Sequence, residues 1–113
     1  MEEFALIFRQ SIAAQLSEEE IKEVMPKWEK WVAGIAAQGK FKPGAHLKDS
    51  GKVLMPGGQI TDGPFVEVKE QLLGVIFVLA DDIDEAITLA HGCPILEEGG
   101  HVEVRPVRKA SNC

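Results

Sequence analysis

Leu72-Leu73-Gly74-Val75-Ile76-Phe77-Val78-Leu79 is apolar apart from Gly74, and its length suits one buried β-strand. A strand with one wet face would alternate apolar and polar residues, so this stretch predicts a strand that is covered on both faces. Phe4-Ala5-Leu6-Ile7-Phe8 has the same character and predicts a second buried strand near the N-terminus. The fold must therefore supply apolar cover for both faces of a sheet.

A first helix is predicted after the N-terminal strand. Ser17 followed by Glu20 forms a capping-box pattern that opens it. At about 100° per residue, the apolar residues of this segment share one face. They are Ile21, Val24, Met25, Trp28, Val32 and Ile35. Pro26 predicts a kink or a restart within the helix, and Gly39 predicts its C-terminal end.

A second helix is predicted after the strand that ends at Leu79. Asp82, with Glu85 three residues on, provides its N-cap. Gly92 and Pro94 are expected to end it. Its expected apolar face consists of Ile83, Ala86, Ile87 and Ala90.

The remaining strands are shorter. Phe41 to Leu47 reads as a strand, and Asp49-Ser50-Gly51 is a turn signal, so Lys52 to Met55 is expected to return as the second strand of a hairpin. Pro56-Gly57-Gly58 interrupts that strand, after which Gln59-Ile60-Thr61 resumes the pairing. Val102 to Arg105 alternates and predicts a last strand with one wetter face.

The resulting order, β-α-β-β-(loop)-β-α-β, predicts an α+β fold: a ferredoxin-like two-layer sandwich with an antiparallel sheet and two helices on one face. We expect a single domain over residues 1–113, with one strand extra or split in the long middle. Since two helices cover only one face, the simplest apolar cover for the other is a second copy of the chain. We therefore expect a homodimer with the two sheets face to face.

Composition excludes several classes of function. With 12 Lys plus Arg against 18 Asp plus Glu, the net charge is −6, which disfavours sequence-independent nucleic-acid binding. No apolar run approaches the roughly 18 residues of a membrane span. Cys93 and Cys113 do not make a disulfide framework, so a reducing, cytoplasmic location is expected.

Several segments together resemble the DGPF-type branch of the YCII-related proteins over about residues 4–107. They are Asp62-Gly63-Pro64-Phe65, then Glu67, Lys69, Glu70, Leu72 and Gly74, then Asp84-Glu85-Ala86, and Glu103-Val104-Arg105-Pro106-Val107. This resemblance implies a ferredoxin-like fold that dimerises into an α/β barrel. The family is largely uncharacterised biochemically, and its wider superfamily includes small-molecule isomerases, dehalogenating enzymes, heme-independent monooxygenases and non-catalytic ligand-sensing domains.

The sequence departs from the other YCII branch at one point. That branch carries a His–Asp pair, and placing its pattern on this chain puts Trp28 near the His and Cys93 near the Asp. The resemblance therefore does not carry that branch's proton-transfer chemistry over to this chain.

The segment from Asp62 to Glu70 is the strongest candidate for a site. In an extended chain Glu67 and Lys69 point the same way, and such a pair in a partly dry cleft can bind a polar substrate and move protons. We predict Asp62, Glu67 and Lys69 as catalytic residues. We predict Phe65, Glu70, Arg105, His46 and Trp28 as substrate-binding residues. The alternatives are a connecting loop with a solvated Glu67–Lys69 ion pair, and an edge or intersubunit salt bridge between Glu103 and Arg105.

No metal site and no cofactor are expected. His46, His91 and His101 lack metal-ligand spacing, and Gly57-Gly58 fits a turn rather than a phosphate loop. The acidic residues from Asp81 to Glu85 are explained by helix capping. A helix C-terminus disfavours a thiolate at Cys93, which argues against a nucleophile there.

Two functions remain open. The first is a small-molecule enzyme doing metal-free, isomerase- or lyase-like proton transfer on an oxygenated organic substrate in a cleft of the dimer. The second is a non-catalytic ligand-binding or regulatory dimer that uses the same cleft.

Overall fold

The computed structural model describes residues 1–11, 17–48, 51–62 and 70–108. Within these residues, the secondary structure comprises six strands, two α-helices and one short 3₁₀-helix. In chain order these are β1 (Glu2–Ser11), α1 (Glu18–Ala37), β2 (Phe41–His46), β3 (Lys52–Leu54), β4 (Ile60–Asp62), β5 (Glu70–Ala80), α2 (Ile83–Ala90), η2 (Pro94–Leu96) and β6 (His101–Pro106).

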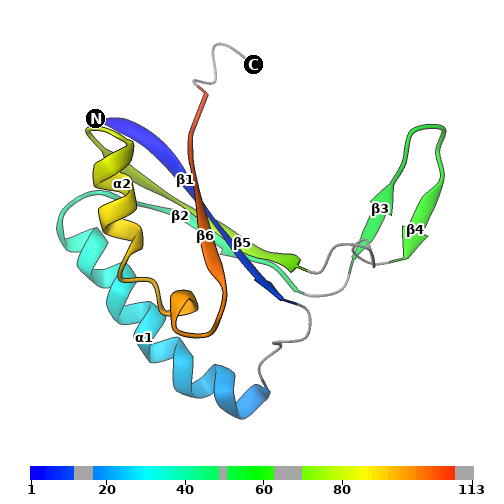
Figure 1. Cartoon of the computed structure of the whole chain (residues 1–113), viewed down its shortest axis with the longest axis horizontal. Coiled ribbons are helices and arrows are strands. Elements are labelled where there is room, and N and C mark those ends of the chain that lie inside the picture. The colour runs from blue at the N-terminus through cyan, green and yellow to red at the C-terminus, as the bar shows by residue number, and fades with distance from the viewer. Residues whose placement is uncertain (12–16, 49–50, 63–69, 109–113) are drawn as a thin grey trace.

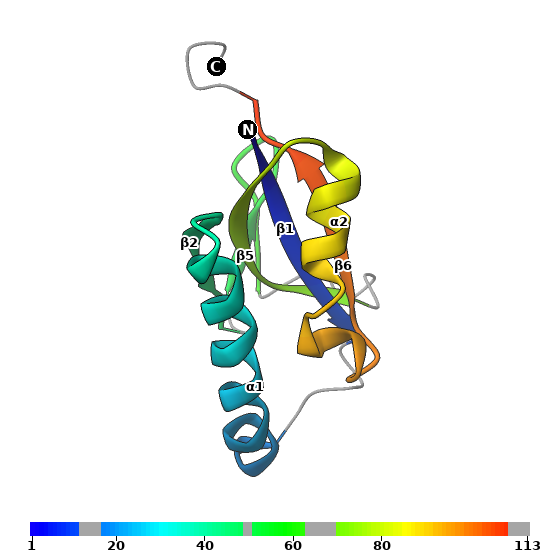
Figure 2. The same cartoon turned by 90° about the vertical axis from the view of Figure 1, so that its left-hand side faces the viewer.

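The main sheet has four strands in the order β2-β5-β1-β6, and each neighbouring pair is antiparallel. The two strands that are apolar on both faces, β1 and β5, therefore lie at its centre. Both helices cover the same face of this sheet (Figures 1 and 2). The α+β class, the antiparallel sheet and the single helix layer of a ferredoxin-like sandwich are confirmed. Neither described α-helix is long and apolar enough to cross a membrane.

The predicted hairpin between Phe41–Leu47 and Lys52–Met55 is wrong. β2 pairs with β5, and β3 pairs instead with β4 in a separate two-stranded sheet. Pro56-Gly57-Gly58 is the turn of this second hairpin, because Gly57 and Gly58 take the positive φ angles of 90° and 88°. Where one extra or split strand was expected in the middle of the chain, a pair of strands is thus inserted between β2 and β5.

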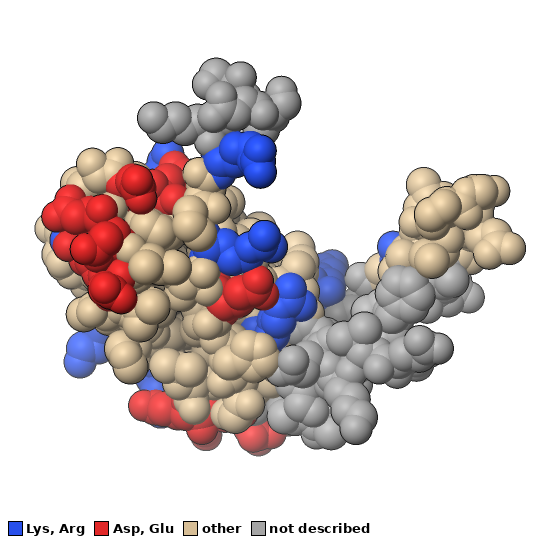
Figure 3. Space-filling view, turned by 45° about the horizontal axis from the view of Figure 1, so that its top comes forward, with Lys and Arg blue, Asp and Glu red and all other residues tan. Residues whose placement is uncertain are grey.

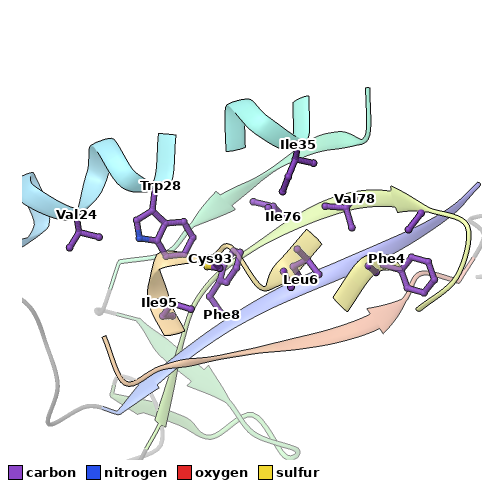
Figure 4. Close-up of a cluster of buried hydrophobic side chains, with 13 residues drawn as sticks. Phe4, Leu6, Phe8, Val24, Trp28, Ile35, Ile76, Val78, Cys93 and Ile95 are labelled. Atoms are coloured by element: carbon purple, nitrogen blue, oxygen red, sulfur yellow. The ribbon is translucent and has the colours of Figure 1, made fainter. Parts of the chain in front are cut away.

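The core lies between the helices and one face of the sheet. Phe4, Leu6 and Phe8 of β1 are at most 1% exposed, and they point toward the helices (Figure 4). Alternate residues of β5 face the same way, since antiparallel pairing sets Leu6 beside Ile76. The other buried apolar side chains of this cluster are Val24, Trp28, Ile35, Val78, Ala80, Ala86, Ala90, Cys93 and Ile95.

The predicted ends of α1 are confirmed. The Ser17 hydroxyl accepts from the Glu20 N–H at 3.2 Å, and the Glu20 carboxylate accepts from the Ser17 N–H at 3.1 Å. Gly39, with φ 71°, follows the last turn, and its N–H donates to Ala36 while that of Lys40 donates to Ile35, as in a Schellman motif. Of the two alternatives predicted at Pro26, a kink or a restart, the restart is wrong, since α1 continues through Pro26.

Two glycines of α1 and its cap should respond oppositely to the same substitution. Gly34→Ala should raise the free energy of unfolding by roughly 0.5–1 kcal/mol, because an added Cβ meets nothing within 4 Å and alanine favours a helix. Gly39→Ala should lower it by about 1 kcal/mol, because φ 71° is costly for an L-residue. Urea denaturation measures both, and shifts of the same sign would contradict the assigned helix end.

Candidate functional site

Four ring side chains meet where β1, α1 and the end of β2 come together, and we call them the aromatic cluster: Phe8, Trp28, Trp31 and His46. The His46 and Trp28 rings are 5.1 Å apart between centroids, at an interplanar angle of 75°. Phe8 packs edge-on against Trp28 at 4.9 Å. His46 is exposed while Trp28 is only 9% exposed, so the cluster is open to solvent at one end and closed at the other.

Helix α1 supplies both indoles because residues three apart lie on one helix face. Trp31 is fixed through its polar edge, since its Nε1–H donates to the Leu89 carbonyl at 2.9 Å. Within the described part of the chain, the Nε1–H of Trp28 donates to no acceptor. The two tryptophans therefore differ: Trp31 anchors α1 to α2, and Trp28 forms the wall beside His46.

The position of His46 depends on a close approach between two backbones. His46 pairs with Gly74 of β5, which in turn pairs with Phe8 of β1. A Cβ at residue 74 would lie 2.4 Å from the Ala45 carbonyl oxygen and 2.9 Å from the His46 Cα. Only glycine permits this approach, so the one interruption in the apolar run is what allows His46 to sit beside Trp28.

Trp28 and His46 are thus brought together, as two of the predicted substrate-binding residues. Asp62 is the last residue of β4 and Glu70 the first of β5. Phe65, Glu67 and Lys69 lie outside the described residues. The roles predicted for the segment from Asp62 to Glu70 therefore stay predictions.

Arg105 does not join this cluster, because it lies on the opposite face of the sheet. It pairs with Ala5, whose side chain points away from the helices, whereas Phe8 points toward them. Its Nε is 3.8 Å from Glu103 Oε2, and the other oxygen of Glu103 accepts from Arg9 Nε at 3.2 Å. The salt bridge that the sequence offered as an alternative is therefore present, and Arg105 cannot contact a ligand held by Trp28 in the same protomer.

Two members of the aromatic cluster were not predicted as site residues. Phe8 was predicted only as part of an apolar strand, and Trp31 was not assigned to a site. The spacing of Trp28 and Trp31 was the available signal, since it places two indoles on one face of α1. Among the described residues, no three His, Cys, Asp or Glu side chains gather as metal ligands would.

Comparison with known proteins adds the family. A family model described as the YCII-related domain matches residues 4–111, nearly the whole chain. The chain belongs to the YCII-related family. A search of curated proteins finds no match for this YCII-related protein.

Trp28 and Cys93, which the resemblance to another YCII branch places near its His–Asp pair, are both buried in the core cluster. Cys93 is 2% exposed, and this burial raises the pKa of its thiol to about 12, although a hydrogen bond from the Ile95 backbone opposes the shift. Indole does not titrate and this thiol stays neutral near pH 7. Neither side chain of this YCII-related protein can therefore replace that proton-transfer pair.

Because the Cys93 thiol is buried, the free energy of unfolding should depend on pH in the alkaline range. Between its ordinary pKa of 9.0 and the folded value of about 12, the unfolded chain loses a proton that the folded chain keeps. The free energy of unfolding should therefore fall as pH rises, by at most about 1.4 kcal/mol per unit. Urea denaturation of wild type and Cys93→Ala at pH 8, 9 and 10 isolates this effect, because both chains retain Cys113. A wild-type advantage that stays constant over this range would contradict it.

Proposed function

We propose that this YCII-related protein is a homodimer that binds a small oxygenated organic ligand at the aromatic cluster. The observation that carries the proposal is the pairing of Trp28 with a solvent-exposed His46 at 5.1 Å. Binding sites for small molecules combine apolar walls with a few placed polar groups. Here the Trp28 ring supplies an apolar wall and the exposed His46 imidazole supplies hydrogen bonds for ligand oxygens, while the fully buried Phe8 packs behind Trp28 and holds it in place.

The homodimer is supported by the face of the sheet that the helices leave uncovered, which we call the open face. Its centre is apolar: Ile7 pairs with Val75, and Ala5 with Phe77. Its edges carry ion pairs, Glu3 with Lys42 on one side and Arg9 with Glu103 on the other. An apolar centre inside a charged rim is the usual composition of a protein interface. Two open faces packed together would hide both centres and keep both rims wet.

Proton transfer on the bound ligand is the further part of this proposal, and Asp62, Glu67 and Lys69 would perform it. Their segment leads directly into β5 at Glu70, four residues before the Gly74 that pairs with His46. Because four strand residues span about 13 Å, this segment joins β5 about 13 Å along the strand from the residue that pairs with His46. Carboxylate and ammonium groups two residues apart on an extended chain, such as Glu67 and Lys69, can divide acid and base roles when water is partly excluded.

Tryptophan fluorescence reports on this site directly, since the only two tryptophans of the chain both lie in it. In a Trp31→Phe background, binding of benzoate, acetoacetate or 2-oxoglutarate should change the emission of Trp28. His46→Ala should weaken the binding of the responding acid by about tenfold, corresponding to roughly 1.4 kcal/mol. His101→Ala, the same change on β6, should alter it less than twofold.

Equal affinity in His46→Ala and wild type would contradict the ligand site. For an acid that does bind at His46, NMR distinguishes an enzyme from a non-catalytic ligand-binding dimer. Turnover, or exchange of a carbon-bound proton with D₂O, that is lost in Glu67→Gln and Lys69→Ala while binding persists identifies the enzyme. Binding without any chemical change identifies the regulatory dimer.

A further inference from the structure

An apolar groove runs between α2 and the edge strand β6, away from the aromatic cluster. It has a volume of about 380 Å³ and is lined by Ile83, Ile87, Ala90, His91, Leu96, Val102 and Val104. Ile83, Ile87 and Leu96 are each 40–44% exposed. Among these residues His91 alone brings a polar side chain.

The groove exists because the apolar face of α2 is wider than its contact with the core. Ala86 and Ala90 are buried, at 0% and 5% exposure. The larger side chains of Ile83 and Ile87, predicted for the same buried face, stay half-exposed beside β6. Because β6 is an edge of the main sheet, no further strand of that sheet covers it.

A matching apolar element projects from the same chain. This element is the β3–β4 hairpin, residues 52–62, which we call the arm. Two of its apolar side chains are strongly exposed, Leu54 at 71% and Ile60 at 63%. Leu54 and Ile60 pair directly across the hairpin, so their apolar side chains lie next to each other on neighbouring strands. Residues 53–61 contain no charged side chain, and Figure 3 shows the arm as a largely uncharged projection with blue at its base.

The arm is closed by its own turn and stands apart from the described body of the protomer. The Met55 N–H donates to the Gln59 carbonyl at 2.7 Å across the Pro56-Gly57-Gly58 turn. A two-stranded hairpin is marginally stable in water unless it packs against something else. Figure 1 shows the arm standing away from the body, on the opposite side of the molecule from α2. Its own groove is therefore not what covers it in this fold.

We propose that the arm of one protomer docks into the groove of a second copy of this chain, so that Leu54 and Ile60 cover Ile83, Ile87 and Leu96 of the partner. This inference rests on the proposed homodimer. Because each copy of the chain carries both this arm and this groove, the two copies can exchange arms in a closed two-fold arrangement. A two-fold axis along the strands lays the β2 edge of one sheet over the β6 edge of the other. Each arm, which follows β2 in the chain, then starts beside the partner's groove.

Disulfide trapping tests this docking. Leu54→Cys and Leu96→Cys are placed on separate, differently tagged chains that both carry Cys113→Ser, and the chains are co-expressed and mildly oxidised. A disulfide needs Cβ atoms about 4 Å apart, so arm docking should link most of the mixed dimers. The matched control pairs Leu54→Cys with Ile21→Cys, a 45% exposed residue of α1, and should link at least tenfold less.

Sedimentation of the same samples before oxidation separates the possible failures. A dimer with cross-linking above the Ile21 control supports arm docking. A dimer whose cross-linking equals the control refutes arm docking but leaves the face-to-face homodimer intact. A monomer at micromolar concentration refutes the homodimer and, with it, the docking that rests on it.

Discussion

The organising constraint of this protein is that its two central strands are apolar on both faces while the chain supplies helices for only one. Phe4, Leu6 and Phe8 of β1 fill the core beneath α1 and α2. Ala5 and Ile7 lie between these residues, so they must point toward the open face because side chains alternate along a strand. The covered face builds the protomer and the aromatic cluster. The open face is the basis for the proposed second subunit.

The candidate site is a continuation of the covered face. Phe8 is both the last large core residue of β1 and the floor of the aromatic cluster, so the packing that stabilises the fold also orients Trp28. His46 reaches the same place only because β5 carries glycine where β2 crosses it. Core and site therefore share their rigid parts, and the His46 imidazole is the most exposed part of the cluster.

Local sequence patterns were sufficient to predict both helices, their caps and the strands of the main sheet. They were not sufficient for strand pairing around residues 41–62. Asp49-Ser50-Gly51 and Pro56-Gly57-Gly58 are both turn signals, and only the long-range pairing of β2 with β5 decides which one closes a hairpin. The contact between Trp28 and His46 was hidden for the same reason. Residue types alone suggested both as ligand contacts, but not that they would meet.

The proposed homodimer requires that a second copy of the chain cover the open face. Hydroxyl-radical footprinting of the wild-type protein, read by mass spectrometry over a dilution series, measures this on the side chains themselves. Labelling of Phe77 and Ile7 should rise on dilution as the dimer dissociates, while labelling of Ile21 on α1 should stay constant. Strong labelling of Phe77 and Ile7 that is the same at every concentration, up to hundreds of micromolar, would contradict it.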